Sequence, residues 1–221
     1  MTLKSNNQAT RSTEMQGKFI AIDGIDGAGK NTQILLIAEY LRDKNIRFQT
    51  SREPGGSELG EKIREIFLDK KLAICRESEL FLLFAARFQH LQSLILPAIN
   101  NGQWIISDRY NDATYAYQGT ARGIEEKILQ SLEALFPNIY REPDLSIILS
   151  PDLNTATTRR KLRGNNPDRI EDENQEFFDA VIRGYEQRAE KNSWCKIIAA
   201  DGTPPEVFAK IKPYLDELIN K

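Results

Sequence analysis

The sequence predicts an α/β fold in which helices flank a parallel sheet of about five strands. Short apolar runs, typical of buried strands, alternate along the chain with longer amphipathic runs that are typical of helices. A glycine-rich loop that ends at Lys30 joins the first strand to the first helix. Polar clusters follow several strands, and open parallel sheets bind their ligands at the carboxyl ends of strands.

The first half of the chain supplies the early strands and the longest helix. The apolar run at 18–23 contains β-branched residues and leads through the glycine-rich loop into a helix. Pro54 and the two glycines after it end regular structure behind the second strand. An apolar stripe at helical spacing marks the longest helix, which Asn101 and Gly102 terminate. The expected strands are 18–23, 47–51 and 104–107, and the expected helices are 30–44, 57–68 and 77–100.

The second half of the chain alternates in the same way. Pro137 closes one helix, and the turn at 164–167 ends another. The expected helices are 124–136, 153–163, 172–191 and 205–219, and the expected strands are 145–149 and 197–200. No shift in composition marks a second domain. We therefore expect residues 17–221 to form one domain behind a flexible polar tail at 1–16.

Composition and charge exclude several functional classes. A net charge of −2 gives the chain no general attraction to nucleic acid or to anionic membranes. No apolar run approaches the roughly 20 residues of a membrane span, and residues 1–16 lack the apolar core of a secretory signal. Cys75 and Cys195 form no disulfide framework, which favours a cytoplasmic location. His90 is the only histidine, so no histidine metal site is expected.

The loop at 24–30 has the glycine and lysine spacing of a phosphate-binding loop. Its glycines allow the backbone N–H groups to point inward, and the following helix adds positive charge at its N terminus. Lys30 would place a full charge beside the outer phosphates. An ordinary glycine turn could have the same spacing, but the flanking strand and helix favour the functional interpretation. Asn31 stands where such loops normally have Ser or Thr facing magnesium.

Asp108 and Arg109 follow the strand at 104–107. Carboxylate oxygens suit Mg²⁺ or its bound water, and a guanidinium group can bind phosphate oxygens in a bidentate manner. A local ion pair at a strand end would explain the same two residues. A phosphate-binding loop at the same edge of the sheet makes the functional interpretation the better one.

The densest basic run of the chain lies at 159–163 and is followed by Asp168 and Arg169. A solvated helix face would account for it. Four cations in five residues repel one another unless an anion is near, and Gly164 with the turn after it would allow movement. We therefore expect a short basic lid over a triphosphate at about 159–170.

Leu83, Phe84 and Arg87 lie on adjacent turns of the longest expected helix. Core packing explains at least one of the two apolar residues. An arginine in that stripe is harder to explain as core. Phe84 and Arg87 could instead stack on and hydrogen-bond a planar base.

Together these motifs resemble those of the thymidylate kinases, and the resemblance extends from about Gly17 to the C terminus. The order of the motifs is more specific than the phosphate-binding loop alone. The stretches that carry the resemblance are 24–32, Arg-Glu-Pro-Gly-Gly at 52–56, Phe-Ala-Ala-Arg at 84–87, Asp-Arg-Tyr at 108–110, Thr-Tyr-Ala-Tyr-Gln-Gly at 114–119, and Arg-Gly at 163–164 with Asp-Arg-Ile-Glu at 168–171.

The resemblance implies a P-loop NTPase-type fold, a homodimer, and transfer of the ATP γ-phosphoryl group to dTMP with Mg²⁺, giving dTDP. It implies catalytic roles for Asp26, Lys30, Arg109 and Arg163 and metal contacts for Asn31 and Asp108. The implied ATP site is Gly24, Ile25, Asp26, Gly27, Ala28, Gly29, Lys30, Asn31, Thr32, Arg159, Lys161 and Arg163. The implied dTMP site is Asp26, Arg52, Phe84, Arg87, Arg109, Thr114, Tyr117 and Gln118.

The chain departs from the family pattern at two positions. Asn31 replaces the loop hydroxyl, and Leu83 occupies the position where an aromatic residue often stacks on thymine, so Phe84 is the expected aromatic neighbour. Gly27 leaves the loop without the arginine that one group of the family has, and the basic lid resembles the bacterial type instead. Two alternatives remain: a P-loop kinase for another deoxynucleotide or nucleoside, and a regulatory nucleotide switch, although the guanine motif is missing.

Overall fold

The computed structural model describes residues 16–162, 164 and 167–221. The predicted tail therefore lies almost entirely outside the described residues, as does Arg163 in the predicted lid. The division into tail and single domain stays a prediction.

Five parallel strands form one sheet in the order β2-β3-β1-β4-β5, which confirms the predicted fold class. Its central strand, β1, is buried along its whole length, as strands covered on both faces must be. Strand β2 begins and ends one residue later than predicted, and β5 begins two residues earlier and ends one residue earlier than predicted. The strands are β1 Phe19–Asp23, β2 Phe48–Arg52, β3 Trp104–Asp108, β4 Leu145–Ser150 and β5 Cys195–Ala199.

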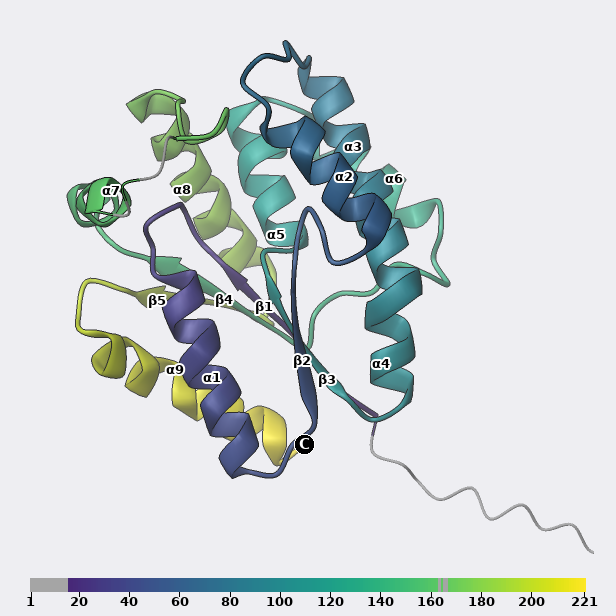
Figure 1. Ribbon diagram of the computed structural model, residues 1–221, viewed down its shortest axis with the longest axis vertical. Helices are drawn as coiled ribbons and strands as arrows, with labels where there is room; N and C mark the ends of the chain where they lie inside the picture. Colours follow the sequence, from purple (N-terminus) through teal and green to yellow (C-terminus); the bar gives the residue numbers. More distant parts are fainter. Residues whose placement is uncertain (1–15, 163, 165–166) are drawn as a thin grey trace, which may run out of the picture.

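Helices cover both faces of the sheet (Figure 1). Helices α1 (Lys30–Asp43) and α9 (Pro204–Ile219) pack against each other on one face. The opposite face carries α2 (Glu58–Leu68), α3 (Arg76–His90), α4 (Leu96–Asn100), α6 (Glu126–Ala134) and α8 (Gln175–Lys191). Helix α7 (Leu153–Leu162) lies at the carboxyl edge of the sheet, beside the loop that joins β1 to α1 (Figure 1).

The predicted helix at 77–100 is one continuous helical segment with a wider turn in its middle. A π-helical turn, η1 (Leu91–Ile95), joins α3 to α4 just before Pro97, which cannot donate a backbone hydrogen bond. By length and composition this segment, Arg76–Asn100, is apolar enough to cross a membrane. Its apolar stripe is buried against β1 and β3 in the C-terminal half and against η2 and α6 in the N-terminal half, so core packing accounts for that composition.

One helical segment has no counterpart among the predicted elements. Helix α5 (Asn111–Thr114) continues into the π-helical segment η2 (Tyr115–Ala121), which packs against α8. The apolar periodicity that marks other helices fails here because the polar residues Asp112, Thr114 and Gln118 are buried. A helix whose inward face is polar indicates a binding site.

Candidate active site

Glycines shape the phosphate-binding loop because its backbone is left-handed at three positions, and at two of them, Gly24 and Gly27, neighbouring atoms also leave no room for a side chain. Gly24, Gly27 and Gly29 have φ angles of 125°, 88° and 97°. A Cβ atom would lie 2.4 Å from the Leu149 carbonyl oxygen at Gly24, and 2.2 Å from the Ala156 carbonyl oxygen at Gly27. The loop therefore touches both β4 and α7, and only glycine fits.

Lys30 folds back over this loop from the first turn of α1. Its Nζ donates to the carbonyl oxygens of Gly24 and Ile25 at 3.2 Å each and lies 3.5 Å from Asp26 Oδ1. Burial lowers the pKa of this ammonium group, and the nearby Arg109 lowers it further. Asp26 is an ion-pair partner of both Lys30 and Arg109, and a phosphate anion would add further negative charge beside these two cations.

Arg109 connects the end of β3 to the same loop. Its backbone has a φ of 70°, and its guanidinium donates from Nη1 to the Gly24 carbonyl oxygen at 2.8 Å and from Nη2 to Asp26 Oδ1 at 3.0 Å. The Tyr117 ring lies beneath it, with 5.2 Å between the guanidinium carbon and the ring centre. A left-handed backbone at an arginine is uncommon and here directs a cation toward the loop.

A polar cavity of about 690 Å³, here called the donor cavity, lies against the loop. Its lining includes both cations described above, so its charge suits a polyphosphate. The predicted residues that line it are Asp26, Gly27, Gly29, Lys30, Asn31, Thr32, Asp108, Arg109, Arg159 and Lys161. Gly24, Ile25 and Ala28 do not line it: the first two contribute carbonyl oxygens to Lys30, and Ala28 packs in the core.

A second, narrower cavity of about 90 Å³, here called the acceptor cavity, lies beside the first. Asp26 and Arg109 line both cavities and mark the place where they meet. The predicted residues Arg87, Thr114, Tyr117 and Gln118 line only the acceptor cavity, together with apolar side chains. An apolar pocket with a few convergent polar groups is typical of a base-binding site.

Arg87 is held in the wall of the acceptor cavity by three hydrogen bonds. Its Nε donates to Glu53 Oε2 at 2.7 Å, its Nη1 to Asn111 Oδ1 at 2.8 Å and its Nη2 to Thr114 Oγ1 at 2.8 Å. Behind it, Glu53 also bonds the His90 ring at 3.0 Å. A guanidinium has five N–H groups, so two stay available to a ligand.

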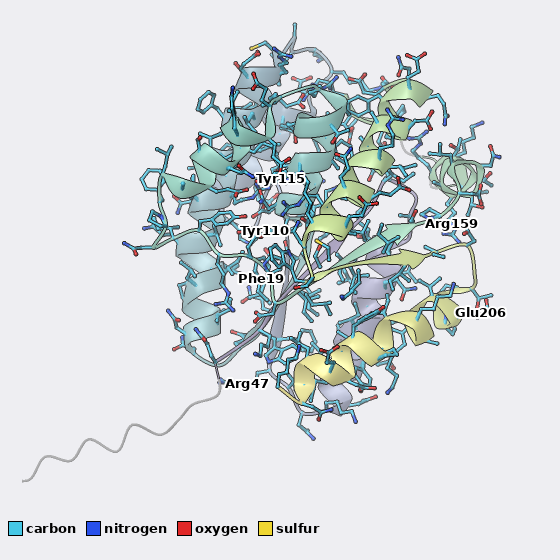
Figure 2. All side chains as sticks on the ribbon, turned by 180° about the vertical axis from the view of Figure 1, so that it is seen from behind. Phe19, Arg47, Tyr110, Tyr115, Arg159 and Glu206 are labelled. Carbon is cyan, nitrogen blue, oxygen red and sulfur yellow. The ribbon has the colours of Figure 1, made fainter. Side chains whose placement is uncertain are left out.

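Arg159 and Lys161 project from α7 into the donor cavity. Arg159 donates from Nη1 to the Ala200 carbonyl oxygen at 2.8 Å, next to the start of α9. Figure 2 shows Arg159 and Glu206, in the first turn of α9, at the same end of the sheet. Arg160 also lines the cavity, whereas Arg163 lies outside the described residues.

A model of the thymidylate kinase family matches residues 22–211, which is most of the chain. The chain belongs to the thymidylate kinase family. The thymidylate kinase of Dichelobacter nodosus is 43% identical over 93% of this chain and 100% of its own length. That of Nitrosomonas europaea is 39% identical over 92% of this chain and 93% of its own length. The crystal structure of thymidylate kinase from Ehrlichia chaffeensis superposes with a TM-score of 0.73 and 31% identity, covering 91% and 99% of the two chains.

Membership of the thymidylate kinase family confirms the predicted resemblance, fold and function, and makes the chain a nucleoside monophosphate kinase that phosphorylates dTMP with ATP as phosphoryl donor. It favours neither of the two alternatives. The roles of individual residues stay predictions, and the structure shows which of these residues line the two cavities.

Arg52 and Phe84, both predicted for the dTMP site, do not line either cavity. Arg52 is half exposed and donates from Nη2 to Glu61 Oε2 at 2.6 Å. Phe84 packs in a buried cluster with Leu80 and Tyr115, and Leu83 lines the acceptor cavity instead. Successive residues of a helix point about 100° apart, so only one of positions 83 and 84 can face the base. This geometry favours Leu83 over Phe84 as the neighbour of the base, and the predicted role of Phe84 stays a prediction.

Arg64 lines both cavities and was missed by the sequence reasoning. It lies on the buried face of α2 with Gly60, Ile63 and Phe67, and its Nη1 donates to the Pro54 carbonyl oxygen at 3.1 Å. Burial lowers the pKa of Arg64. An arginine on the apolar face of an amphipathic helix was the signal that could have found it.

The residues predicted for Mg²⁺ fit a hard cation. Asp108 Oδ1 is buried with no hydrogen-bond partner, and Asp108 and Asn31 share the donor cavity. Among the described residues, no group of three or more His, Cys, Asp or Glu side chains could hold a metal alone. Mg²⁺ typically takes one or two protein oxygens and completes its shell with phosphates and water. Gly29 is the N-cap of α1, so helix capping does not explain Asn31.

Proposed function

We propose that the transfer of the γ-phosphoryl group from ATP to dTMP occurs where the donor and acceptor cavities meet. The observation that carries this proposal is the shared lining of Asp26 and Arg109, which puts a cation and a carboxylate between a phosphate-binding loop and a base-sized pocket. Phosphoryl transfer depends mainly on positioning and on stabilising charge, and these residues supply both.

On the donor side, the loop at 24–30 and Lys30 bind the outer phosphates of ATP. Arg159 and Lys161 on α7, with Arg163 beyond the described part of the lid, add positive charge as the transition state forms. Asn31 and Asp108 would hold Mg²⁺, which neutralises charge on the phosphate oxygens when bound. Thr32 contributes to the wall of the same cavity.

On the acceptor side, Arg109 and Arg64 bind the phosphate of dTMP near the loop. Arg87 donates a free N–H group to a thymine carbonyl, while Thr114 holds the guanidinium in place. Tyr117 and Gln118 complete the pocket. Asp26, which accepts from Arg109 and lies near Lys30, bridges the two cations, offsets their repulsion and faces the region between the two phosphates.

A direct assay tests the proposed reaction. Purified protein is incubated with ATP, Mg²⁺ and dTMP, and the products are separated by anion-exchange chromatography. We expect dTDP and ADP in equal amounts. Hydrolysis of ATP without dTDP would contradict the proposal and would favour the nucleotide switch.

We also propose that the enzyme is a homodimer, with the exposed face of α2 and α3 as the interface. Leu59, Ile66 and Phe81 are 48%, 45% and 62% exposed on these two helices, which pack side by side (Figure 1). Large exposed apolar groups often mark an interface. Sedimentation analysis of the wild type and of Phe81→Glu tests this: we expect a dimer that the substitution weakens. A wild-type monomer would contradict it.

A further inference from the structure

Glu79 is a buried carboxylate on which three side chains converge next to the acceptor cavity. Gln118 Nε2 lies 2.6 Å from its Oε1, and Arg169 Nη1 lies 2.7 Å from its Oε2. Arg122 Nε is 3.4 Å from Oε1. Glu79 is 1% exposed and lies on α3, two turns before Arg87. Its charge is compensated by two guanidinium groups, as a buried carboxylate requires.

The contact with Glu79 fixes which end of the Gln118 amide faces the acceptor cavity. A carboxylate can only accept hydrogen bonds, so the group that Gln118 turns toward it must be the NH₂. The orientation of an amide is assigned from its partners, and this partner allows one orientation. Because Gln118 also lines the acceptor cavity, its carbonyl oxygen is the group presented to a bound base.

We propose that Glu79 is a positioning residue that makes Gln118 selective for bases with a donor at N3. Thymine and uracil carry N3–H, which a carbonyl oxygen accepts. Cytosine has a lone pair at N3, and two facing acceptors both stay unpaired, which costs affinity. This inference rests on the proposed function and adds a second element of base selection beside Arg87.

Arg169 makes the orientation sensitive to a single substitution. In Glu79→Gln, Arg169 Nη1 at 2.7 Å and Arg122 Nη2 at 3.5 Å both donate toward the position of Oε2 and select the new carbonyl oxygen for it, against the single 3.4 Å contact of Arg122 Nε at the position of Oε1. The new NH₂ group then faces Gln118, whose amide must turn its oxygen toward position 79 and its NH₂ toward the cavity. An NH₂ group donates to the N3 lone pair of cytosine. In the variant, the base therefore meets a hydrogen-bond donor of Gln118 in place of an acceptor.

The test compares kcat/KM for dTMP, dUMP and dCMP in the wild type, Glu79→Gln, Glu79→Asp and Glu77→Gln. In Glu79→Gln we expect the dTMP-to-dCMP ratio to fall by about tenfold or more, and kcat/KM for dCMP to rise, since one mispaired hydrogen bond is worth roughly that factor. Aspartate can only accept, so Glu79→Asp keeps the preference. Glu77 lies on the same helix, is exposed and pairs only with Arg76 among its described ion-pair partners, so Glu77→Gln is the matched control.

A rise in dCMP turnover is a gain that structural damage cannot produce. Equal losses with all three acceptors in Glu79→Gln would overturn the proposal, as would an unchanged ratio. If the variant does not fold, a crystal structure of the wild type with dTMP decides: we expect Gln118 Oε1 within hydrogen-bond distance of N3, and Nε2 facing N3 would overturn the inference. Wild-type protein that fails to phosphorylate dTMP would instead contradict the proposed function.

Discussion

The donor cavity, of about 690 Å³, is shaped by backbone atoms of one loop and by charged side chains at its rim. The acceptor cavity, of about 90 Å³, is instead enclosed by buried side chains that are bonded to one another. In the donor cavity, Lys30 and Arg109 contact loop carbonyls and share one carboxylate, that of Asp26. In the wall of the acceptor cavity, Arg87 has three bonded partners, and Glu79, behind the lining residue Gln118, also has three. We therefore expect that a charge can be removed from the donor cavity without unfolding the protein, whereas the buried groups around the acceptor cavity contribute to both function and stability.

Among the substitutions proposed here, Arg87→Met in the wall of the acceptor cavity is expected to have the largest effect, a loss of stability. Removing the guanidinium leaves the buried Glu53 carboxylate without its cation, which costs about 3–5 kcal/mol of unfolding free energy. Urea denaturation measures this loss. Arg76→Met, at an exposed arginine paired with Glu77, is the control and should change stability by less than about 0.5 kcal/mol. An Arg87 variant as stable as the control would remove the distinction drawn between the cavities.

Lys30→Ala should separate activity from stability on the donor side. Loss of the cation beside the transferred phosphoryl group is expected to lower kcat by 100-fold or more, about 3 kcal/mol, while the urea midpoint stays near that of the wild type. Steady-state kinetics at saturating ATP check the first part. Lys127→Ala, at an exposed lysine on α6 outside the proposed dimer interface, serves as the control. Near-normal turnover by Lys30→Ala would exclude its role.

Asp23 lies at the end of β1, beneath the phosphate-binding loop, and we expect it to make the stability of the protein depend on pH. Burial, with the charge of Asp112, raises its pKa from 3.8 to about 7, so the folded protein favours the neutral acid. Wild-type stability should therefore fall as pH rises from about 4 to 7, and Asp23→Asn should avoid that loss. The advantage of the variant should grow by at most about 3 kcal/mol between pH 5 and pH 8 in urea denaturation. A pH-independent difference would show that Asp23 is ionised in the fold.

The smallest effect is expected at Asn31. If its carbonyl oxygen serves Mg²⁺, Asn31→Ala should raise the Mg²⁺ concentration for half-maximal rate several-fold, about 1 kcal/mol, without changing the unfolding midpoint. Asn31→Ser restores an oxygen and should preserve the activity. A magnesium titration of Asn31→Ala that matches the wild type would leave Asp108 as the only proposed protein contact.

The sequence predicted the donor side better than the acceptor side because the donor loop is contiguous. Glycine and lysine spacing at 24–30 specifies both the turn and the charge, and the structure places them together. The acceptor cavity is assembled from α2, α3 and η2, so Arg64 and Glu79 were missed and Phe84 was assigned instead of Leu83. Positions 83 and 84 point about 100° apart on one helix, and the spacing of apolar residues alone cannot tell which of them faces the cavity. Buried polar residues also hid the helical segment at 111–121.

Base selection by the acceptor cavity is the central claim, and an acceptor panel with the wild-type enzyme tests it most directly. At saturating ATP and Mg²⁺, kcat/KM is measured for dTMP, dUMP and dCMP. Arg87 faces the thymine carbonyl with a donor, and Gln118 faces N3 with an acceptor, so both groups oppose cytosine. We expect dTMP and dUMP to exceed dCMP by at least about 100-fold, one factor of roughly ten for each mispaired group. Equal kcat/KM for dTMP and dCMP would contradict the claim.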